Sequence, residues 1–164
     1  MYQQYLKVVT INGRKGVISQ IKIQKNTPIC EFRGEIYSSK ELEGLRDKIN
    51  INDVLQITPS LYLGPSGNAD DHIRHSCNPN CVVHASGRRA ILYSLYLIMP
   101  NNEITFDYST TSTDDLNTWQ MECKCKDPNC RGIISGFYNL NKDLQDKYKT
   151  DEIAPLFIRE PIFR

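Results

Sequence analysis

Three cysteines fall within eight residues in the last third of the chain. Cys123, Cys125 and Cys130 form a C-x-C-x4-C unit, and the proline and asparagine before the last cysteine can bend the chain so that the thiols converge. Thiolates are favoured ligands of zinc, and a structural zinc ion is nearly always four-coordinate. The unit therefore predicts a zinc site that takes one further ligand from elsewhere in the sequence.

The fourth ligand is expected from the only other segment that is rich in metal-binding side chains. Residues 75–81 read H-S-C-N-P-N-C and offer His75, Cys77 and Cys81. The spacing alone does not decide which of these three residues is the fourth ligand. The competing interpretation is that the cysteines are inert buried thiols, which are common in protein cores. It suits Cys30 and Cys81 well and suits the clustered cysteines poorly.

The bulk composition is that of an ordinary globular protein. The chain has 164 residues, of which 40% are hydrophobic and 24% are charged, and its formal net charge is +1. A chain of this length fits one domain with a buried core. The near-neutral charge gives no reason to expect a nucleic acid or an anionic membrane surface as a partner.

The N-terminal sequence MYQQYLKVV lacks the apolar core of a signal peptide, and no apolar run is long enough to span a bilayer. We therefore expect the protein in a reducing compartment inside the cell, either the cytoplasm or the nucleus. In such a compartment, clustered cysteines are more typical of metal sites than of disulfides.

Hydrophobic periodicity and turn residues predict many short strands and few helices. A short helix is expected from Ser39 to about Lys48, because Ser38 and Ser39 can cap it and acidic residues follow. A second helix is expected at 139–148, followed by an irregular tail at 153–163. Strands are expected at 5–11, 17–23, 29–36, 89–98 and 103–108, with turns at 12–16 and 26–28. Two further short apolar runs lie between Ile51 and Leu63, with a break at 58–60. The sequence thus predicts a mostly β domain.

Five motifs occur in an order that resembles one known family. Residues 75–81, H-S-C-N-P-N-C, are followed by E-I-T-F-D-Y at 103–108 and by C-K-C-K-D-P-N-C-R-G at 123–132. Upstream lie K-G-V at 15–17 and E-F-R-G-E at 31–35. Together they resemble SET-domain protein-lysine methyltransferases that carry a post-SET zinc element. The stretch at 62–73 and a tail that contains Gln145, Tyr148 and Pro155 resemble small stand-alone members of prokaryotic type.

The resemblance implies a SET fold of small curved β-sheets, in which the two terminal motifs form a pseudoknot. It places a SET domain at 1–116, and a post-SET zinc element with a C-terminal tail and a short helix at 117–164. It also assigns Cys77 as the fourth zinc ligand and leaves Cys81 as a packed thiol. The implied zinc ligands are Cys77, Cys123, Cys125 and Cys130.

The implied activity is methyl transfer from S-adenosylmethionine to a lysine amine of a protein substrate, such as a histone or another basic protein. Tyr108 matches the catalytic tyrosine of the family, whose hydroxyl positions the amine. Phe106 matches a Phe/Tyr switch, at which a phenylalanine leaves room for more than one methyl group. The resemblance extends the lysine channel to Phe137 and Tyr138, after the last zinc ligand, as part of a lid.

The cofactor side departs from the family pattern at two places. The turn at Arg14-Lys15-Gly16 keeps only the second of two usual glycines, and Arg74 stands where the family has an asparagine that contacts the cofactor. A permanently charged arginine there either pairs with the cofactor carboxylate or obstructs the site. The residues implied to contact the cofactor are Arg14, Lys15, Gly16, Arg74, His75 and Lys124.

Arg74 also supports an alternative function, a weak or inactive SET-like module that binds a lysine-bearing peptide without turnover. A third interpretation is a β-domain with a zinc ion and a purely structural role. The complete E-I-T-F-D-Y motif, with Phe106 and Tyr108 both present, argues against the third.

Overall fold

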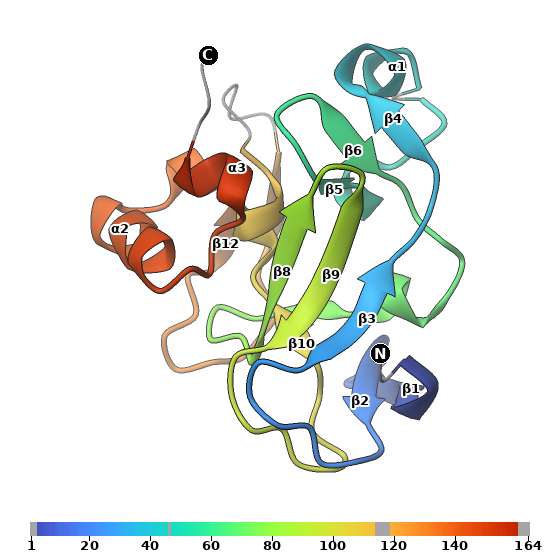
Figure 1. Cartoon of the computed structure of the whole chain (residues 1–164), viewed down its shortest axis with the longest axis vertical. Helices are drawn as coiled ribbons and strands as arrows, with labels where there is room; N and C mark the ends of the chain where they lie inside the picture. Colours follow the sequence, from blue (N-terminus) through green and yellow to red (C-terminus); the bar gives the residue numbers. More distant parts are fainter. Residues whose placement is uncertain (1–2, 46, 114–118, 161–164) are drawn as a thin grey trace.

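A three-stranded antiparallel sheet lies at the centre of the computed structural model, which describes residues 3–45, 47–113 and 119–160 (Figure 1). Along one strand of this sheet, side chains alternate between fully buried and more exposed, as expected for a strand with one face on the core. The strands follow the order β3 (Pro28–Phe32), β9 (Arg89–Ser94) and β8 (Cys81–Ser86).

Four smaller sheets surround this centre, which confirms the prediction of a mostly β fold with several small sheets. One is a hairpin, one is a three-stranded antiparallel sheet, one is a parallel pair and one is an antiparallel pair. In that order they are β1 (Leu6–Ile11) with β2 (Arg14–Ser19), β4 (Ile36–Ser38) with β6 (Leu61–Leu63) and β5 (Leu55–Gln56), β7 (Arg74–His75) with β10 (Thr105–Phe106), and β11 (Gln120–Glu122) with β12 (Ile133–Ser135).

The helices are short. The Ser38 side chain accepts from the backbone N–H of Glu41, and the Glu41 carboxylate accepts from the Ser38 N–H, so the first helix begins with a capping box. The α-helices are α1 (Ser39–Gly44), α2 (Lys142–Thr150) and α3 (Leu156–Arg159), and the 3-10 helices are Gln3–Tyr5, Ile51–Asp53, Ala69–His72, Tyr108–Thr111 and Phe137–Asn139. Among the described residues, no helix is long and apolar enough to cross a membrane.

Several predicted boundaries are wrong by a few residues. The turn predicted at 12–16 is only Asn12-Gly13, so β2 already begins at Arg14. The strand predicted at 29–36 breaks at Gly34, which has φ +145° and passes close to the carbonyl of Gly64, where a Cβ would lie 2.1 Å away. The tail predicted as irregular contains α3.

The other predicted elements are shorter than expected or shifted. The first helix ends at Gly44 rather than near Lys48, the strand predicted at 89–98 ends at Ser94, and that at 103–108 is reduced to β10. The second helix starts at Lys142, where Asn141 caps it. The predicted boundary between residues 116 and 117 lies outside the described residues.

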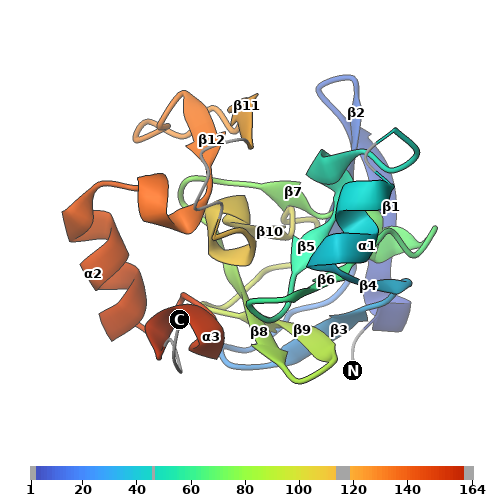
Figure 2. The same cartoon turned by 90° about the horizontal axis from the view of Figure 1, so that it is seen from above.

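Three hydrophobic clusters hold these elements together. The largest lies between the central sheet and its neighbours and contains side chains such as Val17, Leu92 and Phe106. The second joins β8 to α2 and α3, and the third contains Trp119, Cys123 and Ile134. Figures 1 and 2 agree in placing α2 and α3 on one side of the central strands and the β1–β2 hairpin on the other.

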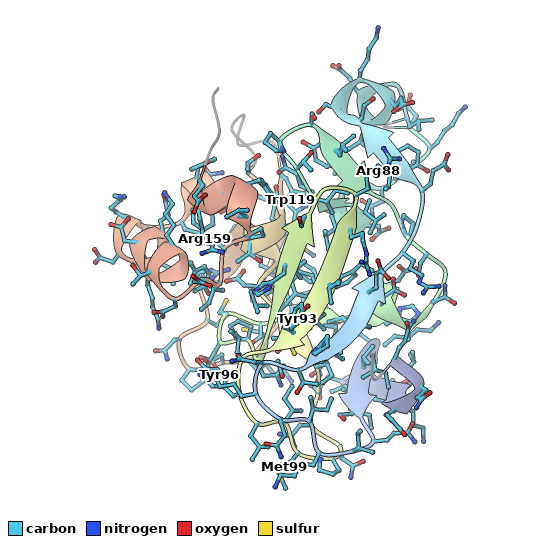
Figure 3. All side chains as sticks on the ribbon, viewed as in Figure 1. Arg88, Tyr93, Tyr96, Met99, Trp119 and Arg159 are labelled. Atoms are coloured by element: carbon cyan, nitrogen blue, oxygen red, sulfur yellow. The ribbon has the colours of Figure 1, made fainter. Side chains whose placement is uncertain are left out.

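Three large apolar side chains, those of Tyr96, Leu97 and Met99, stay exposed in the connection that follows β9. Tyr96 and Met99 lie at the end of the molecule opposite α1, on the segment that leads back toward β10 (Figure 3). They are far from the hairpin tip at Arg88, which Figure 3 also labels.

Candidate functional site

The parallel pairing of β7 with β10 brings the two central motifs together. Thr105 lies opposite Arg74 and Phe106 lies opposite His75, although the partners are about thirty positions apart in the sequence. The side chain of Asn80 strengthens the junction, since its Nδ2 donates to the Glu103 carbonyl over 2.7 Å and its Oδ1 accepts from the Thr105 N–H over 3.0 Å. This pairing is the contact between motifs that the expected pseudoknot requires.

Tyr108 begins a 3-10 turn directly after β10, and Asp107 caps that turn by accepting from the Ser109 N–H. The Tyr108 hydroxyl donates to the carbonyl of Ile73 over 2.8 Å. Burial raises the pKa of Tyr108 to about 12, so the hydroxyl stays protonated at neutral pH. The phenol is therefore a fixed neutral donor whose oxygen can still accept a hydrogen bond.

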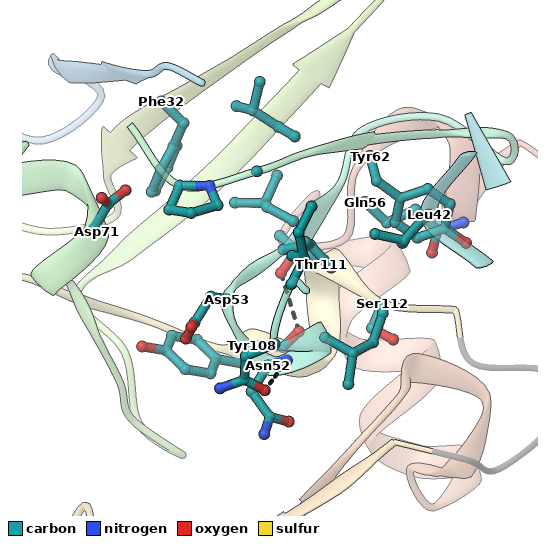
Figure 4. Close-up of a pocket in the computed structure, with 18 of the residues that line it drawn as sticks. Phe32, Leu42, Asn52, Asp53, Gln56, Tyr62, Asp71, Tyr108, Thr111 and Ser112 are labelled. Carbon is teal, nitrogen blue, oxygen red and sulfur yellow. Dashed lines mark hydrogen bonds between the residues drawn. The ribbon is translucent and has the colours of Figure 1, made fainter. Parts of the chain in front are cut away.

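A large cavity of about 1020 Å³ opens on one side of Tyr108. Phe32, Phe106 and Tyr108 give it an aromatic wall, with ring centroids 5.6 Å apart for the first two and 4.9 Å apart for the last two. Asp53, from the 3-10 helix before β5, stands beside the Tyr108 ring in the same cavity (Figure 4). We call this the first cavity.

A smaller cavity of about 290 Å³, which we call the second cavity, lies on the other side of Tyr108. Arg14, Arg74, His75 and Lys124 line it. Among the described residues, Tyr108 is the one that lines both cavities. The structure thus brings four of the six predicted cofactor residues together around one cavity that also reaches the predicted catalytic tyrosine.

Lys15 and Gly16 are not among the described residues that line either cavity. A Cβ added to Gly16 would lie 2.8 Å from Glu103 Oε1 and 3.2 Å from Arg74 Nε. Such a distance to Glu103 is shorter than real Cβ atoms show, so a larger residue would displace these side chains. Gly16 therefore makes room for two charged side chains of this chain.

Arg74 is fully engaged by other parts of the protein. Its Nε donates to Glu103 Oε1 over 2.5 Å and its Nη2 donates to Glu103 Oε2 over 2.7 Å, which is a bidentate ion pair. Its Nη1 donates to the carbonyl of Ile11, at the end of β1, over 3.1 Å. The sequence analysis missed Glu103, although a carboxylate in the motif that pairs with β7 was the available signal.

The four cysteines of the predicted zinc site converge. The sulfur atoms of Cys77, Cys123, Cys125 and Cys130 all lie within 4.8 Å of one another, and those of Cys77 and Cys123 are 3.6 Å apart. Four thiolates around one zinc ion lie about 3.8 Å apart, given Zn–S bonds of about 2.3 Å and tetrahedral geometry. The donor set and its spacing therefore fit a tetrahedral zinc ion.

A tight turn brings the last cysteine back to the first two. Lys126 adopts a left-handed conformation with φ +60°, and the Asp127 side chain then accepts from the Asn129 N–H over 2.8 Å. The Cys130 N–H donates to the Asp127 carbonyl over 2.9 Å, which closes the turn. The structure thus builds the cluster from local chain geometry on one side and from Cys77 on the other.

Two nitrogen atoms lie close to the Cys77 sulfur and can stabilise a metal-bound thiolate. The Arg131 N–H donates to its sulfur over 3.4 Å, and His75 Nε2 lies 3.2 Å from the same sulfur. The Tyr108 N–H donates to His75 Nδ1 over 3.1 Å, so the proton of the neutral ring belongs on Nε2 and points at the sulfur. Burial raises the pKa of the Cys77 thiol to about 11, a cost that a bound cation would offset.

The structure thus distinguishes between the three candidates for the fourth ligand. Cys77 joins the cluster, and His75 contacts Cys77 instead of completing the set. Cys81 is fully buried, and its thiol donates to the Asn80 side chain over 3.3 Å. Cys81 is a packed thiol, as predicted.

A buried ion pair links the segment that follows Cys130 to the turn that begins at Tyr108. Arg131 donates to both carboxylate oxygens of Asp107, over 2.5 Å and 2.7 Å, and the Tyr148 hydroxyl of α2 donates to the same carboxylate over 2.7 Å. Burial alone would raise the pKa of the Asp107 carboxyl, but the hydrogen bonds and the positive charge of Arg131 hold that pKa below its usual range. Asp107 therefore stays charged and ties three distant segments together.

Phe137 and Tyr138 lie elsewhere in the described structure. Phe137 is fully buried in the cluster beneath α2 and α3, and its backbone N–H donates to the Ser112 carbonyl over 2.7 Å. Tyr138 packs against the same cluster. Neither is among the described residues that line the two cavities, so their part in a lysine channel stays a prediction.

Comparison with known protein families gives a match to the SET domain over residues 14–109. Histone-lysine N-methyltransferase ash1 of Drosophila melanogaster is 30% identical over 140 residues, which are 79% of this chain and 6% of that protein. Histone-lysine N-methyltransferase SUV39H2 of Xenopus tropicalis is 27% identical over 154 residues, which are 77% of this chain and 38% of that protein. The chain thus spans only a small part of these relatives.

A solved structure shares the fold. The crystal structure of KRYPTONITE in complex with mCHG DNA and SAH superposes with a TM-score of 0.61 at 26% sequence identity, over 79% of this chain and 28% of that one. This likeness confirms the expected SET fold. It also shows that a protein of this fold binds S-adenosylhomocysteine, abbreviated SAH in that description.

Proposed function

The chain belongs to the SET domain family, and from this we propose that it is a protein-lysine N-methyltransferase that uses S-adenosylmethionine. One observation carries the proposal: Tyr108 lines two cavities of different character, one with an aromatic wall and one with several cationic side chains. A reaction that joins a cofactor to a side chain from another protein needs two entrances that meet at the reacting atoms. Tyr108 is the described residue around which such a meeting point is built.

We assign the second cavity to the cofactor and the first to the lysine-bearing substrate. Arg14 and Lys124 in the second cavity can pair with a carboxylate, such as that of the amino-acid part of S-adenosylmethionine. The aromatic wall of the first cavity suits the apolar stem of a lysine side chain. When bound, S-adenosylmethionine supplies a methyl group carried on a sulfonium.

The task of the protein is to present a neutral amine in line with that methyl group. A free lysine has a pKa of about 10.4, so its amine must lose a proton before it can attack. The aromatic wall of Phe32 and Phe106 offers the amine an apolar surface, and an apolar environment disfavours the ammonium form. Because the Tyr108 hydroxyl already donates to the Ile73 carbonyl, its oxygen is left to accept from the amine and orient its lone pair.

Zinc is proposed as a structural partner. Cys77, Cys123, Cys125 and Cys130 would hold it, and the ion would fix the segment that carries Lys124 against the second cavity.

Phe106 in place of a tyrosine leaves space beside Tyr108, which supports the addition of more than one methyl group. The relatives named above are histone-lysine methyltransferases, so histones are the first substrates to test.

Calorimetric titration with S-adenosylmethionine, followed by mass spectrometry of histones after incubation with the protein, tests the proposal. We expect measurable cofactor affinity and added masses of 14 Da per methyl group on lysines. The variant Tyr108→Phe should keep the affinity and lower the turnover number about 100-fold, because the amine loses its orienting partner. Tyr93→Phe, on β9 and away from the described cavity linings, is the matched control.

The alternative is a module that binds a lysine-bearing peptide without turnover. Arg74 in the second cavity is the observation that favours it, since a guanidinium there occupies space near the cofactor. Peptide binding without any affinity for S-adenosylmethionine would establish this alternative and refute the enzyme.

A further inference from the structure

The lining of the second cavity carries more positive than negative side chains. Four cationic side chains and two carboxylates line it, and the carboxylates belong to Glu103 and Glu122. Glu122 pairs with Lys124 over 3.0 Å at the surface, with its side chain 70% exposed. The Glu103 side chain is only 25% exposed and pairs with Arg74. Glu103 is therefore the better shielded negative charge of a cavity with a cationic excess.

We propose that Glu103 is a specificity-determining residue that lets this cationic cavity accept a sulfonium cofactor in preference to its neutral thioether product. The inference rests on the proposed function, since it assigns the second cavity to S-adenosylmethionine. Arg74 is a positioning residue in this account. Its bidentate pair with Glu103 and its hydrogen bond to the Ile11 carbonyl fix the carboxylate and the β1–β2 turn in one arrangement.

The packing around the pair shows that its place is built into the fold. Gly16 on β2 leaves the space that Glu103 and Arg74 fill, and a Cβ there would collide with the carboxylate. The Asn80 side chain holds the Glu103 backbone carbonyl on the other side. The carboxylate is thus restrained from two directions, and its charge stays at the wall of the cavity.

The chemistry of the two ligands supplies the discriminating measurement. S-adenosylmethionine and S-adenosylhomocysteine differ by one methyl group and one positive charge. A residue that acts only through shape changes the affinity for both, whereas a residue that acts through charge changes the ratio of the two affinities. This ratio can be measured by calorimetry without any turnover.

The variant Glu103→Gln keeps the shape of the side chain and one acceptor for Arg74 but leaves the guanidinium charge uncompensated. We expect the dissociation constant for S-adenosylmethionine to rise about tenfold, while that for S-adenosylhomocysteine changes less than about twofold. The variant Arg74→Gln leaves Glu103 unpaired and should shift the ratio several-fold toward S-adenosylmethionine. The double variant should return close to the ratio of the natural protein. The shifts should shrink at high salt, because the pair is partly exposed.

Glu31→Gln is the matched control, because Glu31 pairs with Arg89 over 2.6 Å and lies outside both cavities. Equal losses for the two ligands in Glu103→Gln, or no change in the ratio in either single variant, would overturn the inference. The opposite shifts expected for the two single variants keep the test decisive even if one of them folds poorly. A natural protein that binds neither ligand would instead refute the proposed function itself.

Discussion

Two arginine–carboxylate pairs flank Tyr108, and they differ in burial and in the number of their partners. On one side, the Asp107 side chain has no exposed surface and accepts from Tyr148 and from Arg131, whose own side chain is 18% exposed, so it is the carboxylate that differs in burial. On the other side, Arg74 and Glu103 are 20% and 25% exposed and line the second cavity. Both pairs are bidentate, so geometry alone does not distinguish them.

The difference suggests a division of roles. A buried charge is tolerated only when it is paired and hydrogen-bonded. Loss of either partner of the Asp107 pair should therefore strongly destabilise the fold. A partly exposed pair contributes little to stability and can act on ligands through its charge. A third pair, Arg89 with Glu31, has an arginine that is 63% exposed and provides the reference for the surface.

Removal of zinc should have the largest effect on stability and cofactor binding. It should disturb the surroundings of the Arg131–Asp107 pair more than those of the Arg74–Glu103 pair. Arg131 directly follows Cys130, one of the four clustered cysteines, whereas Arg74 is held by β1 and Glu103. After chelation we expect a lower melting temperature, loss of S-adenosylmethionine binding, and loss of amide protection at 120–135. Hydrogen exchange should still show protection in the β1–β2 hairpin, and added zinc should restore the rest. Unchanged cofactor affinity after chelation would contradict the role given to the zinc segment.

Arg131→Gln should come next, because it leaves a buried carboxylate without its cation. Breaking such a pair costs about 3–5 kcal/mol. We expect a loss of this order in the free energy of unfolding, measured by urea denaturation. Arg88→Gln, at the exposed tip of the β8–β9 hairpin, should leave stability unchanged. A loss as small as that of the control would show that Asp107 does not need its partner.

Tyr148→Phe removes one donor from the same carboxylate and keeps the ion pair. A hydrogen bond to a charged group contributes about 1.5–3 kcal/mol, so we expect a loss in this range and less than for Arg131→Gln. Zinc content should not change. A stability equal to that of the natural protein would mean that α2 is held by the packing of its cluster alone.

The cluster of four cysteines could be predicted from the sequence to a large extent, because its members lie in short motifs. Three of them are local, and Cys77 came from the resemblance; the structure brings the four together. Tyr108 was likewise marked by its motif, and the structure places it on both cavities. Strand content also followed from residue type, since runs of β-branched and aromatic residues favour pleated structure.

The charge partners could not be predicted in this way. The Arg74–Glu103 pair depends on the parallel pairing of β7 with β10, and the contact of Tyr148 with Asp107 spans 41 positions. Periodicity does not report such contacts, because they depend on tertiary packing. From the sequence, Arg74 was therefore interpreted as a charge beside the cofactor, and its partner Glu103 was not identified.

Arg74→Gln should affect stability far less than Arg131→Gln. Exposed pairs contribute about 0–1 kcal/mol, and the Arg74 pair is partly screened by solvent, so we expect a loss of about 1 kcal/mol or less. The hydrogen bond to the Ile11 carbonyl is lost as well, which should show as faster amide exchange at the end of β1. A loss as large as that for Arg131→Gln would remove the distinction between the two pairs.

Arg89→Gln should have the smallest effect of all. The Arg89 side chain lies on the surface of β9, and its distance of 2.6 Å to Glu31 resembles the distances within the other two pairs. Solvent weakens the Coulomb attraction of this pair, and holding two long side chains in one geometry costs conformational entropy. The attraction and the entropy cost therefore nearly cancel. We expect a melting temperature within experimental error of the natural protein and no change in affinity for either cofactor form. Since the three pairs have similar lengths, a measurable loss here would show that burial is not what sets their contributions, and the ordering of the preceding variants would need another explanation.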